Sequence, residues 1–355
     1  MMVSDLRLQN CLVLGIILLF TKILYCTSTD DAIAKAIQAI TPVCVFDTHS
    51  VSFFLYSKDD PYGVDIGKDI DCDKKNLSSI QPNQPILITV HGFTSTGNNT
   101  NMYGIIREWI NVTKNTAISL DWSIPACHTN ISLVTNNLAY GQAVKNVRVV
   151  AKGLAESLIK MNQTCGVPFE MINIVGHSLG AHVAGFAGKN VQAMTDAIVH
   201  KIIGLDPAGP LFDTVGLDGR LSKYDAEEVI VVHTSILGIP KYIGHTDICV
   251  NGAVIQPGCE DLTNWISCSH SFSLKVMRDS LRPDCSLLAT PCSSCLSSRH
   301  TYSSYPESNC TNDTCYEFNI GTCTYNAKGV MCLKTTKKHP YCKAHSKEIK
   351  NCTLL

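Results

Sequence analysis

The sequence has no excess of charge of either sign. The 355 residues include 29 lysines and arginines against 30 aspartates and glutamates, for a formal net charge of −1. Such a chain has no global field that would attract nucleic acid or a strongly anionic surface. The sequence also has no basic stripe and no aromatic stacking motif. We therefore expect no nucleic-acid partner.

The sequence also lacks a set of metal ligands at suitable spacing, although it has 18 cysteines. Cysteine-based zinc sites need paired Cys-x-x-Cys segments or histidine clusters at ligand spacing. Only Cys292-Ser-Ser-Cys295 has this spacing, and no second pair follows closely. The cysteines therefore predict disulfides in an oxidising compartment, and no metal site.

The N-terminus lacks an apolar run long enough to cross a bilayer. The ten apolar residues 11–20, extended by 23–25, fall short of the roughly 20 residues that a span needs. They suit the h-region of a secretory signal peptide, so we predict a signal peptide at 1–28, cleaved within 26–30, and a secreted, extracellular protein. An uncleaved anchor is the alternative. Loss of Cys11 and Cys26 leaves sixteen cysteines, an even number that permits complete pairing.

In a secreted chain, Asn-x-Ser/Thr sequences are candidate surface glycosylation sites. Two of the eight, at Asn309 and Asn351, have cysteine in the middle, and we expect them to stay unused. The other candidates are Asn76, Asn98, Asn111, Asn130, Asn162 and Asn312.

Internal repeats and low-complexity segments are absent, and strand and helix patterns alternate. Apolar, β-prone runs predict strands at 52–56, 85–90, 117–120, 172–175, 199–205 and 228–233. Apolar residues at helical spacing predict helices over 102–112, 139–159 and 272–281. This alternation predicts an α/β fold with a mostly parallel central sheet flanked by helices. We expect one domain over 29–355, whose cysteine-rich tail (285–355) packs on it and contributes a late strand at 329–334.

The pentapeptide Gly176-His-Ser-Leu-Gly180 follows an apolar strand and precedes a run of small residues that favours a tightly packed helix. A Gly-x-Ser-x-Gly sequence in this strand–turn–helix context predicts a nucleophile elbow, in which a strained turn lifts the Ser178 hydroxyl above the sheet. The two glycines leave room where a side chain would collide with the neighbouring strand or helix. Ser178 is therefore the candidate nucleophile.

A serine hydroxyl needs a base, which is usually a histidine held by a carboxylate. Asp206 closes a predicted strand downstream of Ser178, which is the expected place for that carboxylate. Further acidic candidates in loops are Asp213, Asp218 and Asp247. The histidines that follow Asp206 are His233, His245 and His270, and spacing alone leaves the choice of base open. His270 follows Cys268-Ser269, so a disulfide would hold its loop.

His91-Gly92-Phe93 ends an earlier predicted strand. The backbone N–H groups of Phe93 and Leu179 would point at a tetrahedral oxyanion. We therefore predict an oxyanion hole at Phe93 and Leu179.

Five motifs in the correct order resemble the animal pancreatic-lipase family. They are Val90-His-Gly-Phe93, Leu120-Asp-Trp122, Gly176-His-Ser-Leu-Gly-Ala-His-Val-Ala-Gly185, Gly204-Leu-Asp-Pro-Ala-Gly-Pro210 and Cys268-Ser-His270, and the match extends from about residue 44 to 342. The resemblance implies an α/β-hydrolase fold with Ser178 as nucleophile, Asp206 as orienting carboxylate and His270 as base. It also implies a disulfide between Cys259 and Cys268 at the base of the lid, and the oxyanion positions Phe93 and Leu179.

Within this family, the chain resembles the secreted phospholipase A1 branch of arthropods more than the digestive triglyceride lipases. The lid between Cys259 and Cys268 has only eight residues, and the loop 235–243 is also short. The C-terminal lipid-binding sandwich of the digestive lipases is absent, so no colipase partner is implied, and we expect a monomer. One departure is Cys249, which stands where the family usually has an aromatic residue.

The resemblance implies a hydrolase that cleaves the sn-1 fatty acyl ester of glycerophospholipids, acts at a membrane or lipid surface and needs no metal or organic cofactor. Trp265 and Ile266 on the short lid are candidates for contact with lipid, and an ordinary solvent-exposed loop is the alternative. A neutral triacylglycerol or galactolipid lipase is the second hypothesis. A non-catalytic lipid carrier or yolk-type protein is the third, and the complete triad argues against it.

Overall fold

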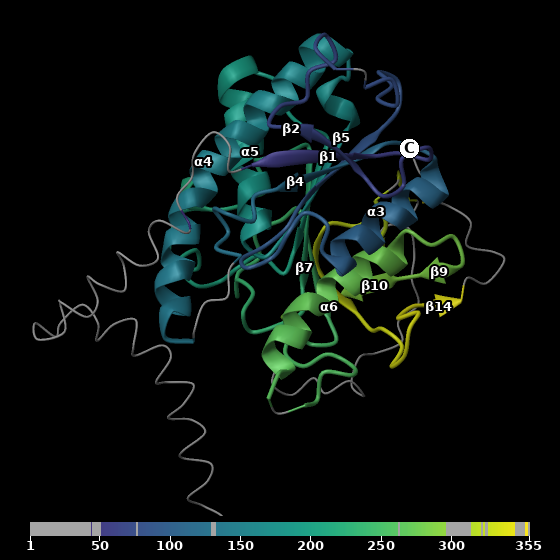
Figure 1. Cartoon of the computed structure of the whole chain (residues 1–355). Coiled ribbons are helices and arrows are strands. Elements are labelled where there is room, and N and C mark those ends of the chain that lie inside the picture. The colour runs from purple at the N-terminus through teal and green to yellow at the C-terminus, as the bar shows by residue number, and fades with distance from the viewer. Residues whose placement is uncertain are drawn as a thin grey trace, which may run out of the picture.

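The computed structural model describes residues 44, 51–75, 77–128, 133–261, 263–295, 314–320, 322–323, 326–344 and 352–353. The predicted signal peptide and the candidate glycosylation sites Asn76, Asn130 and Asn312 lie outside these residues. Within them, the predicted α/β architecture is confirmed: one twisted sheet is flanked by helices on both faces (Figure 1).

The main sheet has eleven strands in the described part of the chain. Their spatial order is β11 (Tyr316–Glu317), β10 (Leu288–Pro291), β13 (Gly329–Leu333), β8 (Thr246–Val250), β7 (Glu228–His233), β6 (Lys201–Leu205), β5 (Ile172–His177), β3 (Ile86–Val90), β4 (Ala117–Asp121), β1 (Ser52–Tyr56) and β2 (Val64–Gly67). Strands from β13 to β4 pair in parallel, and the pairs at both edges are antiparallel. β3 and β6 are buried along their whole length, as expected of parallel strands covered on both faces.

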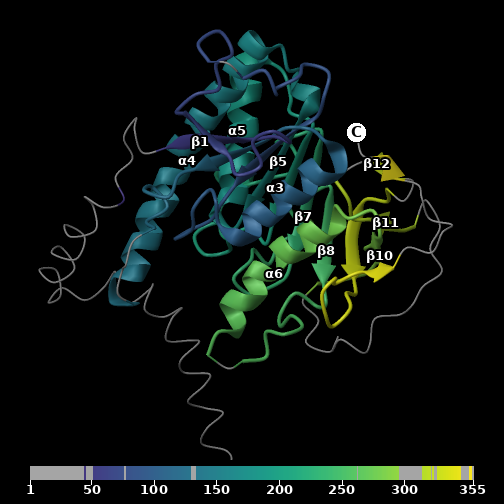
Figure 2. The ribbon, with the colours of Figure 1, turned by 45° about the vertical axis from the view of Figure 1, so that its right-hand side comes forward.

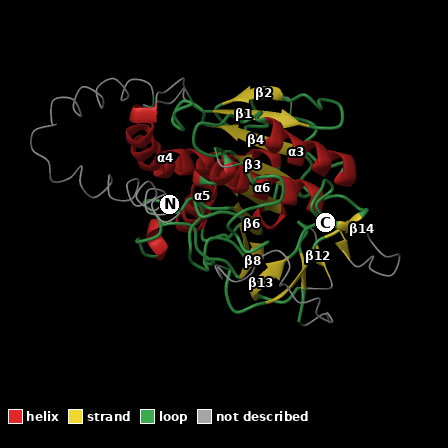
Figure 3. Cartoon of the chain, turned by 90° about the horizontal axis from the view of Figure 1, so that it is seen from below, coloured by secondary structure: helices red, strands yellow, loops and turns green. Residues whose placement is uncertain are grey.

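Two pairs of helices cover the sheet (Figure 3). α4 (Leu133–Cys165) and α5 (Leu179–Thr195) contribute to one core, and α3 (Thr100–Thr113) and α6 (Trp265–Ser280) contribute to the other. The buried residues of α3 recur at the helical spacing seen in the sequence, and Asn99 caps its N-terminus by accepting a hydrogen bond from the Asn101 N–H. No helix within the described ranges is long and apolar enough to span a bilayer.

Several elements differ from the sequence prediction, and two of them, α6 and β8, lie close to the candidate site residues. α6 begins at Trp265 rather than at 272, so His270 lies on a helix and not in a loop held by a disulfide. The first turn of α6 is half-buried and therefore has no regular apolar pattern that would reveal it. Strand β8 was not predicted, because the buried Asp247 interrupts its apolar run.

The cysteine-rich tail extends the sheet as well as packing on it (Figure 2). The predicted late strand is confirmed as β13, which pairs with β8, while β10 and β11 add to the same edge. Short antiparallel pairs join β9 (Cys285–Ser286) to β14 (Lys343–Ala344) and β12 (Thr322–Cys323) to β15 (Cys352–Thr353). Disulfides among the described residues join Cys44–Cys127, Cys72–Cys165, Cys249–Cys295, Cys259–Cys268, Cys285–Cys342 and Cys292–Cys332.

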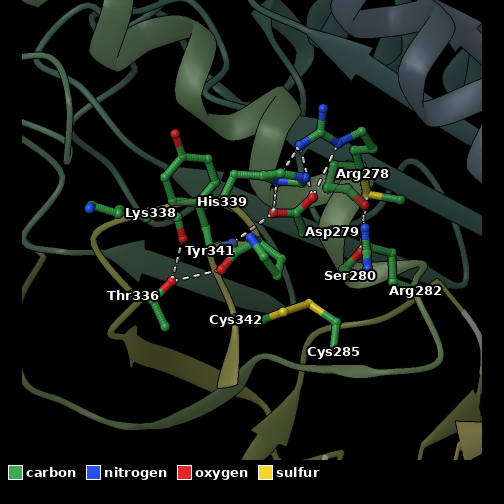
Figure 4. Close-up of polar contacts among 12 residues, drawn as sticks. Arg278, Asp279, Ser280, Arg282, Cys285, Thr336, Lys338, His339, Tyr341 and Cys342 are labelled. Atoms are coloured by element: carbon green, nitrogen blue, oxygen red, sulfur yellow. Dashed lines mark hydrogen bonds and ion pairs between the residues drawn. A yellow bond between two sulfur atoms is a disulfide. The ribbon is translucent and has the colours of Figure 1, made fainter. Parts of the chain in front are cut away.

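A buried carboxylate joins the tail to the C-terminal end of α6 (Figure 4). Asp279 is fully buried and accepts hydrogen bonds from the Arg278 guanidinium and from the Tyr341 N–H, at 3.0 and 2.8 Å. The disulfide Cys285–Cys342 lies beside the same contact between the tail and α6. The tail therefore fixes the far end of the helix that carries His270.

Candidate active site

Ser178 lies in the sharp turn between β5 and α5, with φ 57° and ψ −121°. This conformation is costly for a residue with a side chain, and strain of this kind is typical of a nucleophile elbow. A Cβ atom at Gly180 would collide with the carbonyl oxygens of Val90 and His91, and one at Gly176 would collide with the Gly180 carbonyl. The glycines of the pentapeptide are therefore required by close backbone approach.

Asp206 and His270 meet at the carboxyl ends of the parallel strands. His270 Nδ1 lies 2.7 Å from Asp206 Oδ2, and the Asp206 side chain is fully buried. Asp206 Oδ1 accepts hydrogen bonds from the backbone N–H groups of Thr234 and Ser235, at 2.8 and 3.2 Å, and the Ser235 hydroxyl donates to Oδ2. Burial acts to raise the pKa of Asp206, but these hydrogen bonds and the nearby His270 outweigh it and lower that pKa. Asp206 is therefore held as a carboxylate.

Ser178 and His270 line the same cavity, whose volume is about 520 Å³. Phe93 and other residues from the loops after β3 and β6 also line the cavity. A cleft with a serine, a histidine and a buried carboxylate behind it has the parts needed for nucleophilic acyl transfer.

The other candidate bases have different partners. His233 Nε2 lies 2.8 Å from Asp247 Oδ1, and both residues are buried. His245 Nδ1 accepts a hydrogen bond from the Val229 N–H at 3.0 Å. The structure thus places His270, and neither of these two, against Asp206.

The oxyanion positions predicted at Phe93 and Leu179 flank Ser178. A Cβ atom at Gly92 would lie 2.8 Å from Ser178 Cβ, so the loop after β3 passes directly over the nucleophile. His91 Nε2 accepts the Trp122 N–H at 3.0 Å, and the His91 carbonyl accepts the Trp122 indole N–H at 2.8 Å. Trp122 therefore braces the loop that carries Phe93.

Phe93 makes an edge-on contact with Tyr140, with ring centroids 5.3 Å apart. The Tyr140 hydroxyl donates to the Pro210 carbonyl at 2.9 Å. This chain of contacts connects the loops on the two sides of the cavity.

The short lid covers little of this cavity. The disulfide Cys259–Cys268 closes it, and Trp265 and Ile266, both half-buried, form the start of α6. Among the described residues that line the cavity, Ser267 is the one between those two cysteines. The lid thus leaves the cleft largely uncovered.

Sequence reasoning did not identify Ser235 or the buried His177 as parts of this site. Ser235 follows β7 and has no local signal, because its importance depends on its contact with Asp206. His177 stands inside the Gly176–Gly185 motif, which was the signal that could have found it.

The sheet, the elbow and the Asp–His pair define an ester hydrolase of the α/β-hydrolase class. The model of the Lipase family matches residues 23–341, and the chain belongs to that family.

Proteins from wasps and hornets are similar over nearly their whole length. Phospholipase A1 3 of Polistes dominula is 38% identical over 318 residues, covering 88% of this chain and 96% of the relative. Phospholipase A1 of Polybia paulista is 34% identical, covering 88% of this chain and 95% of the relative. Probable phospholipase A1 magnifin of Vespa magnifica is 32% identical, covering 92% and 95%.

Proposed function

We propose that the protein is a phospholipase A1, a serine hydrolase that cleaves the sn-1 acyl ester of glycerophospholipids. The observation that carries this proposal is the short lid over the Ser178 cavity, because an open cleft admits a bulky polar headgroup. The names of the wasp and hornet relatives support the same substrate class.

In the proposed first half-reaction, Ser178 Oγ attacks the sn-1 carbonyl carbon while His270 Nε2 takes the hydroxyl proton. Asp206 stabilises the imidazolium that forms. The N–H groups of Phe93 and Leu179 stabilise the negative charge on the carbonyl oxygen. His270 then gives its proton to the sn-1 oxygen, and the lysophospholipid leaves an acyl-Ser178 ester.

In the second half-reaction, His270 takes a proton from water as the water oxygen attacks the acyl carbonyl. The proton returns to Ser178 Oγ, and the fatty acid leaves. Each step uses only groups of this chain and water, and the chemistry calls for no metal or organic cofactor.

The Lipase family match supports a second candidate, a neutral triacylglycerol or galactolipid lipase with the same triad. The experiment that separates the two uses phosphatidylcholine labelled separately at sn-1 and sn-2, together with triolein, and includes Ser178→Ala. Release of label from sn-1 alone, abolished in Ser178→Ala, supports phospholipase A1. Preference for triolein supports the second candidate, and no release from any substrate contradicts both.

We further propose that the protein is secreted after loss of residues 1–28 and acts as a monomer at lipid surfaces without colipase. The disulfides of the described residues support an oxidising, extracellular environment. Asn98 and Asn111 are exposed and open to glycosylation, whereas Asn162 donates its amide N–H to the Val167 carbonyl at 2.9 Å. Mass spectrometry of the secreted protein would test the N-terminus and the glycans together.

A further inference from the structure

His177, the residue before the nucleophile, touches the candidate base directly. Its Nε2 atom lies 3.2 Å from the backbone carbonyl oxygen of His270. The two imidazole rings also face each other, with centroids 4.6 Å apart and an interplanar angle of 43°. Since a carbonyl oxygen only accepts, His177 Nε2 carries the proton of this hydrogen bond.

The surroundings of His177 keep it neutral. The titratable groups that act on it are His270 on α6, Asp206 after β6 and His91 after β3. Burial, followed by the neighbouring His270, lowers the pKa of His177 from 6.5 to about 3. A neutral His177 with its single proton on Nε2 is a fixed donor, and it places no second positive charge beside an imidazolium on His270.

The N-terminal half of α6 is attached to the rest of the chain at few points, one of which is Ser269 Oγ, which accepts the Gln256 N–H at 3.1 Å. Asn264 precedes the helix without making a side-chain cap, and the buried residues of α6 begin only at Ser269. The Cys259–Cys268 disulfide ties this end to the lid. His270 therefore stands in the second turn of a helix whose first turn is only half-buried, and its carbonyl oxygen also accepts the Ser273 hydroxyl, at 3.0 Å.

We propose that His177 is a positioning residue for the base, which holds the backbone of His270 and packs on its ring. Asp206 holds the same imidazole from the other side, at Nδ1. Together the two contacts keep His270 Nε2 directed at Ser178. The inference rests on the proposed triad mechanism, but not on which lipid is the substrate.

The chain offers a matched control in His182, five positions further along the same motif. It is also buried, its pKa is also lowered to about 3, and its Nε2–H donates to the Ala208 carbonyl at 2.8 Å. Its ring stacks on Phe212 with centroids 3.7 Å apart. His182 is thus buried and neutral like His177, but its partners are Ala208, Phe212 and the Leu221 N–H, which donates to His182 Nδ1 at 3.2 Å, rather than His270.

The experiment compares His177→Phe, His177→Gln and His177→Asn with His182→Phe in the full chain. Phe keeps an aromatic ring and loses the donor, Gln places an N–H near the position of Nε2, and Asn carries the same amide on a shorter side chain. The substrate is a soluble p-nitrophenyl ester, so lipid preference does not enter. The readouts are kcat, KM, the rate of inactivation by a fluorophosphonate, the melting temperature and the low-field proton resonance of His270 Nδ1–H.

For His177→Phe we expect kcat and the inactivation rate to fall roughly 10- to 100-fold, because small misplacements of a reacting group have effects of this size. We expect KM to change less than kcat, because the proposed role of His177 is to position His270, although His177 also lines the cavity. The low-field resonance should broaden or move. His177→Gln should recover most of the activity, and His177→Asn should not. The Gln and Asn pair tests the proposal even if the Phe variant fails to fold.

His182→Phe should lower the melting temperature and leave the low-field resonance in place. The proposal is overturned if Gln and Asn at position 177 behave alike, or if the resonance is unchanged in both His177→Phe and His177→Asn. A wild-type protein that neither cleaves the ester nor reacts with the fluorophosphonate would instead contradict the proposed function.

Discussion

His270 Nδ1 lies 2.7 Å from Asp206 Oδ2, although 64 positions separate the two residues in the chain. Strand β6 delivers Asp206, and the second turn of α6 delivers His270. The two meet because the sheet brings the carboxyl ends of its parallel strands together and α6 packs across them. Several measurements can test what this contact and its neighbours do.

Asp206→Asn should lower kcat about 10⁴-fold with little change in folding, because the amide cannot stabilise the imidazolium and favours the wrong tautomer. Steady-state hydrolysis of a soluble ester would measure this. Asp218→Asn is the control, since Asp218 is exposed and has no role in the proposed mechanism. Equal effects of the two substitutions would contradict the assignment of Asp206.

Ser235→Ala should lower kcat/KM about tenfold, or ~1.4 kcal/mol, because Asp206 Oδ2 loses a hydrogen bond in a buried site. Thr234→Val is the matched control. Thr234 contributes its backbone N–H to Asp206, which valine retains, and its own buried hydroxyl has no hydrogen-bond partner. The control should keep its activity and should not lose stability. Ester hydrolysis and urea unfolding would measure both, and a larger loss in Thr234→Val than in Ser235→Ala would refute this account.

Acid should destabilise the fold through its neutral histidines. Burial lowers the pKa of His177 and of His182 from 6.5 to about 3, so between these values the unfolded chain binds protons that the folded chain excludes. The free energy of unfolding should be fully retained above pH 6.5 and fall below it by about 1.4 kcal/mol per pH unit for each histidine. The pKa of His245 is also lowered, chiefly by burial, and acts in the same direction.

Urea unfolding at pH 7.5, 5.5 and 4.5 would measure this slope. Asp206 and Asp121 have lowered pKa values and contribute only below about 3.8. Burial raises the pKa of Asp225 above 3.8, which acts in the opposite direction, so a histidine variant is needed to isolate the histidine contribution. His182→Gln keeps a donor and removes one titrating group, and it should flatten the slope by about 1.4 kcal/mol per pH unit. An unchanged slope in this variant would rule out the explanation.

Gly180→Ala should cost roughly 3 kcal/mol or prevent folding, because the added methyl group meets the Val90 and His91 carbonyls. Gly153→Ala is the opposite case. Gly153 lies inside α4 with no atom within 4 Å of the added Cβ, so this substitution should stabilise by about 0.5–1 kcal/mol. Urea unfolding measures both variants. A stable, active Gly180→Ala protein would show that the elbow can hold a methyl group where the structure leaves no room for one.

The parts of this protein that the sequence predicted depend on neighbours along the chain. The strand before Gly176, the helix after Gly180 and the position of Asp206 at a strand end follow from local apolar patterns and close packing. The late strand β13 is predicted for the same reason, since its apolar run lies within one short segment. The family resemblance then identified His270 as the base that acts with Ser178 and Asp206.

Tertiary structure alone decided which groups come together from distant segments. It placed His270 against Asp206, while His233 pairs with Asp247. It started α6 at Trp265 and joined Cys249 to Cys295. It also brought Ser235 into contact with Asp206 and His177 into contact with His270. None of these contacts has a local pattern, because each forms only when the sheet closes and low-dielectric burial makes an unpaired polar group costly. The apolar periodicity along the chain determined the strands and helices, and the packing of these elements determined which side chains meet at the carboxyl ends of the strands.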